Sequence, residues 1–150
     1  MIYVECKPDK ILIHTLDIRE ITHFGGRCFV CRELERRKNL VAVIDEDPRG
    51  PQPSYLKKLK LIKQQNSLKL FYDKENNNKV IMICPRLEEW ILKAAKQQKI
   101  KLSDYNLPHE SNQFHLVVNL DITNFQKLIH TLKKSKNKML ITLKKFISNC

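Results

Sequence analysis

The sequence predicts an α/β protein in which a mainly parallel sheet of about four to five strands is flanked by helices. Strand-like and helix-like runs alternate over about residues 1–95, which implies parallel strands with helices on both faces. The run NLVAVID at 39–45 has an unbroken aliphatic centre, as a central strand covered on both faces should have. Only helices are expected beyond about residue 104. The 150 residues therefore form one expected domain, with a core at about 1–95 and a helical C-terminal extension at about 104–150.

Short apolar runs and helical spacings alternate in the first part of the chain. The strand MIYVE precedes a helix whose first turn suits Pro8 and Asp9. Gly25 and Gly26 break the next strand, EITHF, and start an amphipathic helix. The elements expected here are strands at 1–5, 20–24 and 39–45 and helices at 7–16 and 27–38.

The second part begins with a loop, because PRGPQP at 48–53 contains three prolines and a glycine. Leu56, Leu59 and Ile62 then share one helical face, which predicts an amphipathic helix. Asp121 caps a later helix, and Asn137 starts the last one. The expected elements are helices at 54–65, 85–98, 122–134 and 138–147, strands at 67–73 and 79–84 around a polar turn at 74–78, and a segment at 101–120 that slightly favours a helix.

The chain carries 28 Lys and Arg against 16 Asp and Glu, a formal net charge of +12. Such a surface attracts polyanions without sequence preference, so nucleic acid is the leading partner class, DNA before RNA. The alternative is that the charge serves solubility alone. No apolar run approaches the roughly 20 residues that span a bilayer, and the N-terminus lacks the apolar stretch of a signal peptide. We therefore expect a cytoplasmic protein with no membrane partner.

The five cysteines are irregularly spaced, which argues against a disulfide framework. Cys28 and Cys31 form a C-x-x-C pair, but a zinc site needs about four ligands and no second pair is near. We interpret the two as neighbours on a helix, with a redox or metal role as the alternative.

Acidic side chains follow two of the expected strands at their carboxyl ends. Glu5 ends the first strand, and Asp45 and Asp47 follow the third. In a parallel sheet these ends lie at one edge, where functional residues gather. Crowded carboxylates repel one another unless a cation neutralises them, and Mg²⁺ prefers such hard oxygen ligands. By itself, the D-x-D spacing also fits an ordinary acidic turn.

The combination of motifs resembles the Toprim domain, the fold shared by topoisomerases, bacterial primases and overcoming-lysogeny nucleases. The family's first motif is an apolar strand ending in Glu-Gly. IYVECKPD is similar to it through Glu5, although Cys6 replaces the glycine. The second motif is D-x-D-x-x-G after an apolar strand, and it is complete here as Asp45, Asp47 and Gly50.

Two further features are similar to the overcoming-lysogeny subgroup. Asp9 stands four residues after the glutamate, where that subgroup has another metal-binding acid, and Gly25-Gly26 resembles its glycine turn. The resemblance covers about residues 1–95 and implies a Toprim-like, Rossmann-like sheet. It leaves the later helices unexplained.

The resemblance implies Mg²⁺-dependent (or Mn²⁺-dependent) cleavage or nicking of nucleic acid, in a defence or repair system. Glu5 would serve either as a general acid or base or as a plain ligand. The implied catalytic residues are Glu5, Asp45 and Asp47, and the implied metal ligands are Glu5, Asp9, Asp45 and Asp47, for one ion or two. The expected phosphate contacts are Lys7, Lys10, Arg27 and Arg49.

Two other functions stay open. The chain is alternatively a non-catalytic nucleic-acid-binding or regulatory subunit that works with a partner ATPase, as the overcoming-lysogeny resemblance suggests. It is otherwise a phosphohydrolase of small nucleotides. No Gly-rich phosphate loop is present, so any ATPase must be another chain. Topoisomerase activity is not expected, because no strand-passage domain is present.

Several other residues carry two interpretations. Glu88 and Glu89 begin an expected helix, where acidic residues are favourable whether or not they bind a metal. His109 and His115 have no partner at ligand spacing. The basic run at 132–145 either follows a nucleic-acid backbone or is the solvated side of an amphipathic helix pair.

Overall fold

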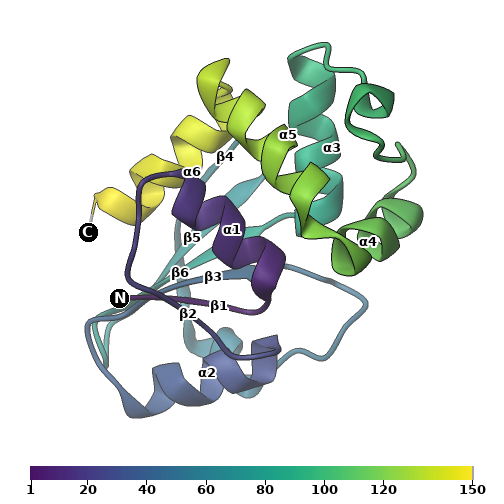
Figure 1. The fold of residues 1–150 in the computed structure, drawn as a ribbon. Coiled ribbons are helices and arrows are strands. Elements are labelled where there is room, and N and C mark those ends of the chain that lie inside the picture. The colour runs from purple at the N-terminus through teal and green to yellow at the C-terminus, as the bar shows by residue number, and fades with distance from the viewer. Residues whose placement is uncertain (150) are drawn as a thin grey trace.

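Six strands form one mixed sheet in the order β2-β1-β3-β6-β5-β4 in the computed structural model, which describes residues 1–149 (Figure 1). Cys150, the last residue of the expected extension, lies outside the described residues. The strands are β1 (Ile2–Val4), β2 (Ile21–His23), β3 (Val41–Asp45), β4 (Lys60–Gln65), β5 (Leu68–Asp73) and β6 (Asn78–Ile83). The helices are α1 (Lys7–Thr15), α2 (Arg27–Arg36), α3 (Leu87–Gln97), α4 (Ser111–Leu120), α5 (Ile122–Lys134) and α6 (Lys138–Ser148), with 3₁₀ turns η1 (Ser54–Lys58) and η2 (Leu102–Tyr105).

The predicted α/β class is confirmed, but the sheet is larger and more mixed than expected. β1 pairs in parallel with β2 and β3, and β3 pairs in parallel with β6. β5 is antiparallel to both β6 and β4. One half of the sheet therefore has the parallel arrangement that the alternating pattern predicts, and the other half is a three-stranded meander.

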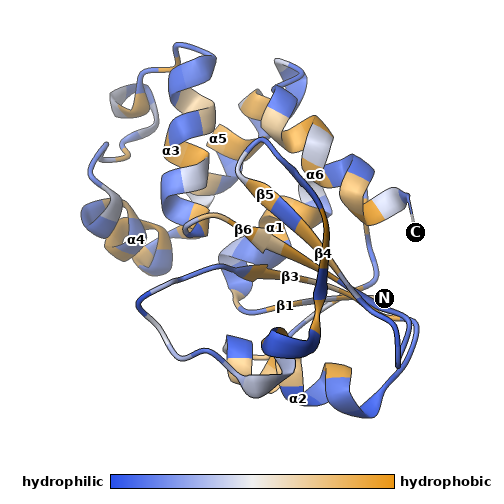
Figure 2. Cartoon of the chain, turned by 180° about the vertical axis from the view of Figure 1, so that it is seen from behind, coloured by the Kyte–Doolittle hydropathy of each residue, from blue (hydrophilic) through white to orange (hydrophobic). Residues whose placement is uncertain are grey.

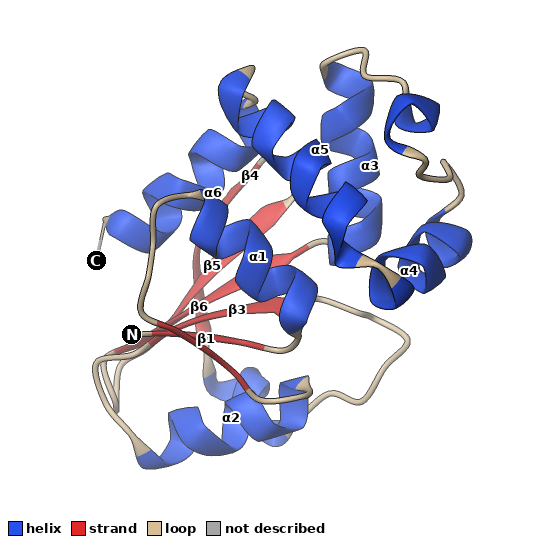
Figure 3. Cartoon of the chain, in the orientation of Figure 1, coloured by secondary structure: helices blue, strands red, loops and turns tan. Residues whose placement is uncertain are grey.

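Helices cover the two faces of the sheet unequally (Figure 3). α1, α3, α5 and α6 lie on one face, and α2 lies on the other with η1. The central strands β3 and β6 are mostly apolar (Figure 2), because successive side chains point to opposite faces and both faces are buried. In β3, Val43 packs toward the larger group of helices, whereas Ala42 and Ile44 pack toward α2 and η1.

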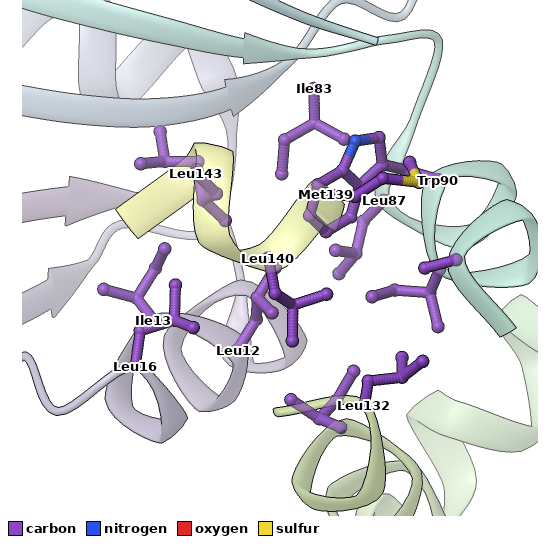
Figure 4. Close-up of a cluster of buried hydrophobic side chains, with 14 of the residues drawn as sticks. Leu12, Ile13, Leu16, Ile83, Leu87, Trp90, Leu132, Met139, Leu140 and Leu143 are labelled. Carbon is purple, nitrogen blue, oxygen red and sulfur yellow. The ribbon is translucent and has the colours of Figure 1, made fainter. Parts of the chain in front are cut away.

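The larger core joins the C-terminal helices to the rest of the fold. Figure 4 shows Leu12 of α1, Trp90 of α3, Leu132 of α5 and Leu140 of α6 in one apolar cluster. Each of these side chains is at most 2% exposed. The C-terminal helices α5 and α6 therefore complete the core on this face of the sheet.

The helix expected at 54–65 is wrong. A 3₁₀ turn ends at Lys58, and residues 60–65 form the edge strand β4 against β5. The spacing of Leu56, Leu59 and Ile62 fits a helical face, but KLKLIK also alternates as a strand does. Pairing with β5 decides between the two, because it satisfies the backbone of this segment along a neighbouring strand.

The segment at 101–120 is a helix only over Ser111–Leu120, and a 3₁₀ turn and a loop precede it. The remaining expected elements are present with shifts of a few residues at their ends. Gly25 and Gly26 both adopt positive φ before α2, as the glycine turn requires. Asp121 accepts a hydrogen bond from Thr123 N, and Asn137 accepts from Met139 N, so both predicted caps are confirmed. None of the helices described is long and apolar enough to cross a bilayer.

Candidate active site

The carboxyl ends of β1 and β3 open into a cleft of about 570 Å³. Its acidic lining residues come from segments that are far apart in the sequence, namely Glu5, Asp45, Asp47 and Glu88. Glu5 Oε2 accepts a hydrogen bond from Asp45 N at 3.2 Å. This bond directly joins the ends of two parallel strands, so the structure brings the predicted acids of both motifs together.

Asp9 lies behind the cleft in the first turn of α1 and is 2% exposed. Its Oδ2 accepts from the backbone N and the Sγ of Cys6, both at 3.0 Å. Cys6 thus occupies the position before the helix where the family motif has glycine, and its thiol is a donor to the buried carboxylate. Burial, followed by the charge of Asp9, raises the pKa of Cys6, so the thiol keeps its proton.

The carboxylates hinder one another's ionisation. Burial, followed by repulsion from Asp9, raises the pKa of Glu5 to about 7. The pKa of Asp45 is also raised, by burial first and then by Asp9, Glu5 and Glu88. Burial likewise raises the pKa of Asp9, although the donors of Cys6 oppose this shift. The cleft therefore disfavours the ionised forms of these carboxyl groups, which a bound cation would stabilise.

The start of α3 supplies a further acid. Asp45 Oδ1 accepts from Leu87 N at 3.0 Å, which ties the end of β3 to this helix. Glu88, the next residue, is 9% exposed, and its Oε1 lies 2.7 Å from His115 Nδ1 of α4. His115 also lines the cleft. The Glu88–His115 pair places an imidazole beside the predicted acids.

The loop after β3 turns sharply at the D-x-D-x-x-G motif. Gly50 N donates to Asp47 O at 2.9 Å, and a Cβ at Gly50 would overlap the Asp47 carboxylate. A side chain at position 50 would therefore displace the Asp47 carboxylate and the Arg27 guanidinium. The Asp47 side chain remains partly exposed, and its Oδ2 is 3.8 Å from Arg27 Nη2.

Arg27 is a clamp for this loop. Its guanidinium is 6% exposed and donates to the carbonyls of Asp45 and Glu46 at 3.2 and 2.6 Å and also to the carbonyl of Pro51. The predicted phosphate contact of Arg27 stays a prediction, since most of its donors already bind backbone oxygens.

Replacing Arg27 with Met is expected to lower the free energy of unfolding by about 3 kcal/mol, because buried carbonyls lose a charged donor. Urea unfolding followed by circular dichroism measures the change. Arg36→Met, at an exposed position of the same helix, is the matched control and should cost no more than about 0.5 kcal/mol. Equal losses of unfolding free energy in the two variants would show that the hydrogen bonds of Arg27 to the loop carbonyls do not stabilise the fold.

The other three predicted phosphate contacts lie outside the acidic cleft. Lys7 is exposed near the junction of α4 and α5, and Lys10 is half-buried on α1. Arg49 is exposed and shares a neighbouring hollow with Arg86 and Glu89. None of these three cations lines the acidic cleft. Cys28 and Cys31 both lie on α2, and burial raises the pKa of Cys31 to about 12, which does not suit a reactive thiol.

The chemistry of the donors fits a hard divalent cation. Glu5 and Asp45 each use one carboxylate oxygen in a hydrogen bond to a backbone N–H, and Asp47 is partly exposed at the same opening. In residues 1–149, however, no three Asp, Glu, His or Cys side chains already stand as ligands around one point. Binding an ion here would require the carboxylates to turn toward each other.

The sequence pattern did not identify His115 and Arg86 as residues of this cleft. His115 and Glu88 are 27 positions apart, and only the packing of α4 against the start of α3 brings them together. Arg86 lines the cleft and binds Glu89 in the same helical turn. The Arg86–Glu89 pair could have been predicted from the sequence, because residues three apart on a helix are neighbours. No spacing in the sequence predicts the contact between His115 and Glu88.

Comparison with family models, curated proteins and solved structures gave no match for this chain.

Proposed function

We propose that this protein is a divalent-metal-dependent nuclease that cleaves or nicks nucleic acid, of the Toprim type that its motifs resemble. The observation that carries the proposal is the hydrogen bond between Glu5 and the backbone of Asp45, forty residues away, at the carboxyl end of the sheet. Asp47 and Glu88 line the same cleft. The raised pKa values of Glu5 and Asp45 support a site that binds positive charge.

Glu5, Asp45 and Asp47 would hold Mg²⁺ or Mn²⁺, with Asp9 as a further ligand. When bound, such an ion polarises a phosphoryl oxygen and stabilises the leaving oxygen of a phosphodiester. The chain itself orients the carboxylates, since Leu87 N fixes Asp45 and Asp45 N fixes Glu5. Because its pKa is about 7, Glu5 is able to take up or release a proton near neutral pH.

The charge of the whole chain supports a polyanionic substrate. The cleft is acidic, yet the chain carries a net charge of +12, so the surface outside the cleft is strongly basic. A surface of this kind attracts the phosphates of nucleic acid, while a bound cation would let one phosphate enter the cleft.

The test is cleavage of supercoiled plasmid with Mg²⁺, with Mn²⁺ and with EDTA. Nicking is expected with either metal and not with EDTA, and Glu5→Gln is expected to abolish it. Gln keeps the acceptor for Asp45 N, so the variant should remain folded. Calorimetric titration of Mn²⁺ into both proteins measures metal uptake directly. Absence of both nicking and Mn²⁺ uptake by the folded wild type would refute the proposal.

A second candidate is a non-catalytic subunit that binds nucleic acid beside a partner ATPase. The hydrogen bonds that tie Asp9 to Cys6 and Asp45 to Leu87 N favour it, since they give these carboxylates a structural role. Binding of DNA without uptake of Mn²⁺ would select this candidate. Hydrolysis of a free nucleotide and not of plasmid would instead select a small-nucleotide phosphohydrolase.

A further inference from the structure

Positive charge is concentrated on two segments that contain no acid. No Asp or Glu occurs between Ser54 and Tyr72, a span that includes β4, or between Ile122 and Asn149, a span that includes α6. Four lysines on these elements are exposed and have no carboxylate within ion-pair distance among the residues described. We call them the basic strip, which consists of Lys60, Lys63, Lys138 and Lys145.

A β-bulge places both strand lysines on the same face of the sheet. Lys60 pairs with Tyr72 and Lys63 with Leu70, because the register shifts between Leu61 and Lys63. Tyr72 and Leu70 are two residues apart on β5, so they and their cross-strand partners share a face. In a regular strand Lys60 and Lys63 would point to opposite faces, and the extra residue removes this difference.

That face is the one that α6 covers. Leu70 packs in the larger core with the helices, and Lys63 Nζ lies 5.8 Å from the ring centre of Phe146. Asn66, just after β4, donates to Thr142 Oγ1 at 2.7 Å. Lys138 and Lys145 are four residues before and three residues after Thr142, so they share its side of the helix. The two pairs of lysines are therefore neighbours across the β4–α6 seam.

The strip runs along β4 and α6, away from the edge of the sheet where the cleft opens. Through Tyr72 and Lys79, Lys60 is level with Val41 at the start of β3. Lys138 lies beside Asn66, which follows the end of β4 that is level with Asp45.

From β3, which ends in Asp45, the sheet continues through β6 and β5 to β4. Neighbouring strands are about 4.8 Å apart, which puts β4 about 14 Å from β3. Lys60 is in addition displaced along the sheet by four residues, about 13 Å, from the level of Asp45 to that of Val41. Between them, Lys69 of β5 pairs with Glu46, the residue after β3.

We propose that the basic strip binds the phosphate backbone of nucleic acid and holds the substrate on the β4 side of the cleft. This proposal rests on the proposed function for the class of substrate. It adds where on the surface the substrate binds and in which direction it runs. Its charged groups are lysine ammonium groups, and the ring of Phe146 beside Lys63 is buried. The contact is therefore with phosphates and has no preference for base sequence.

The test compares two triple variants with the same loss of charge. The strip variant carries Lys60→Gln, Lys63→Gln and Lys145→Gln. The control carries Arg36→Gln, Lys38→Gln and Lys74→Gln, which are exposed on α2, after α2 and in the β5–β6 turn. Fluorescence anisotropy measures binding of a labelled DNA duplex in EDTA over a range of salt concentrations, and circular dichroism checks the fold.

The strip variant is expected to bind at least about tenfold more weakly, and the slope of log K against log salt should fall by about 2.7. The control should change little. Equal weakening in the two variants would overturn the proposal, because net charge alone would explain it. Failure of the wild type to bind duplex while it binds anionic phosphatidylserine vesicles would also overturn it. Because EDTA prevents metal-dependent cleavage, this experiment measures binding alone. Its outcome is therefore separate from the outcome of the plasmid-cleavage test.

Discussion

Asp45→Asn is expected to reduce metal-dependent cleavage of plasmid by about 10³-fold or more, because the metal's stabilisation of transition-state charge is worth several kcal/mol. Asn has nearly the same shape and keeps the oxygen that accepts from Leu87 N, so the end of β3 and the start of α3 should stay in place. The variant is also expected to melt at a higher temperature than the wild type without metal. This follows because the raised pKa of Asp45 reports unfavourable ionisation in the folded protein.

The two readouts separate a catalytic role from a structural one. Asp104→Asn removes the same charge from an exposed position on η2 and should alter neither cleavage nor melting. A structural role for Asp45 would instead lower the melting temperature together with the activity. A folded Asp45→Asn protein that cleaves within a few-fold of the wild type would exclude Asp45 from the metal site.

Much of the parallel half of the fold is predictable because its signals are local. The aliphatic run of β3 and the glycine break before α2 each indicate their element without knowledge of distant residues. β4 is different, because its leucines fit a helical face as well as a strand. Its strand structure depends on the edge that β5 offers, and that edge exists only once β5 has joined β6.

The acidic site is predictable to a similar extent. A general rule about parallel sheets suffices to bring Glu5 and Asp45 to one edge, and the structure confirms that they meet. The rule does not reach the Glu88–His115 pair, which depends on where α4 packs. It also does not show that Arg27 faces inward, since an arginine at the start of a helix is usually solvated.

Stability of the metal-free protein is expected to fall as pH rises from about 4.5 to about 7. Glu5 has a folded-state pKa of about 7 against an ordinary value of 4.5, so the folded state binds more protons than the unfolded state in this window. The free energy of unfolding therefore decreases with pH there, and the raised pKa values of Asp9 and Asp45 act in the same direction. The melting temperature should be higher near pH 5 than near pH 7.5 by about 5 °C or more.

Divalent metal should reverse this loss, because ligand binding to the folded state adds to its stability. Mn²⁺ is expected to raise the melting temperature near pH 7.5, where the carboxylates would otherwise repel, and to have little effect near pH 5, where protons compete with it. Acids whose pKa is lowered, such as Asp17 and Glu89, do not confuse the result, since their effects end below about pH 4.5. Glu5→Gln should reduce the wild-type pH dependence to the part that Asp9 and Asp45 cause, and it should weaken the Mn²⁺ effect. Parallel curves of melting temperature against pH for the two proteins, with and without Mn²⁺, would contradict both claims. Glu5 would then neither destabilise the metal-free protein when ionised nor bind the ion.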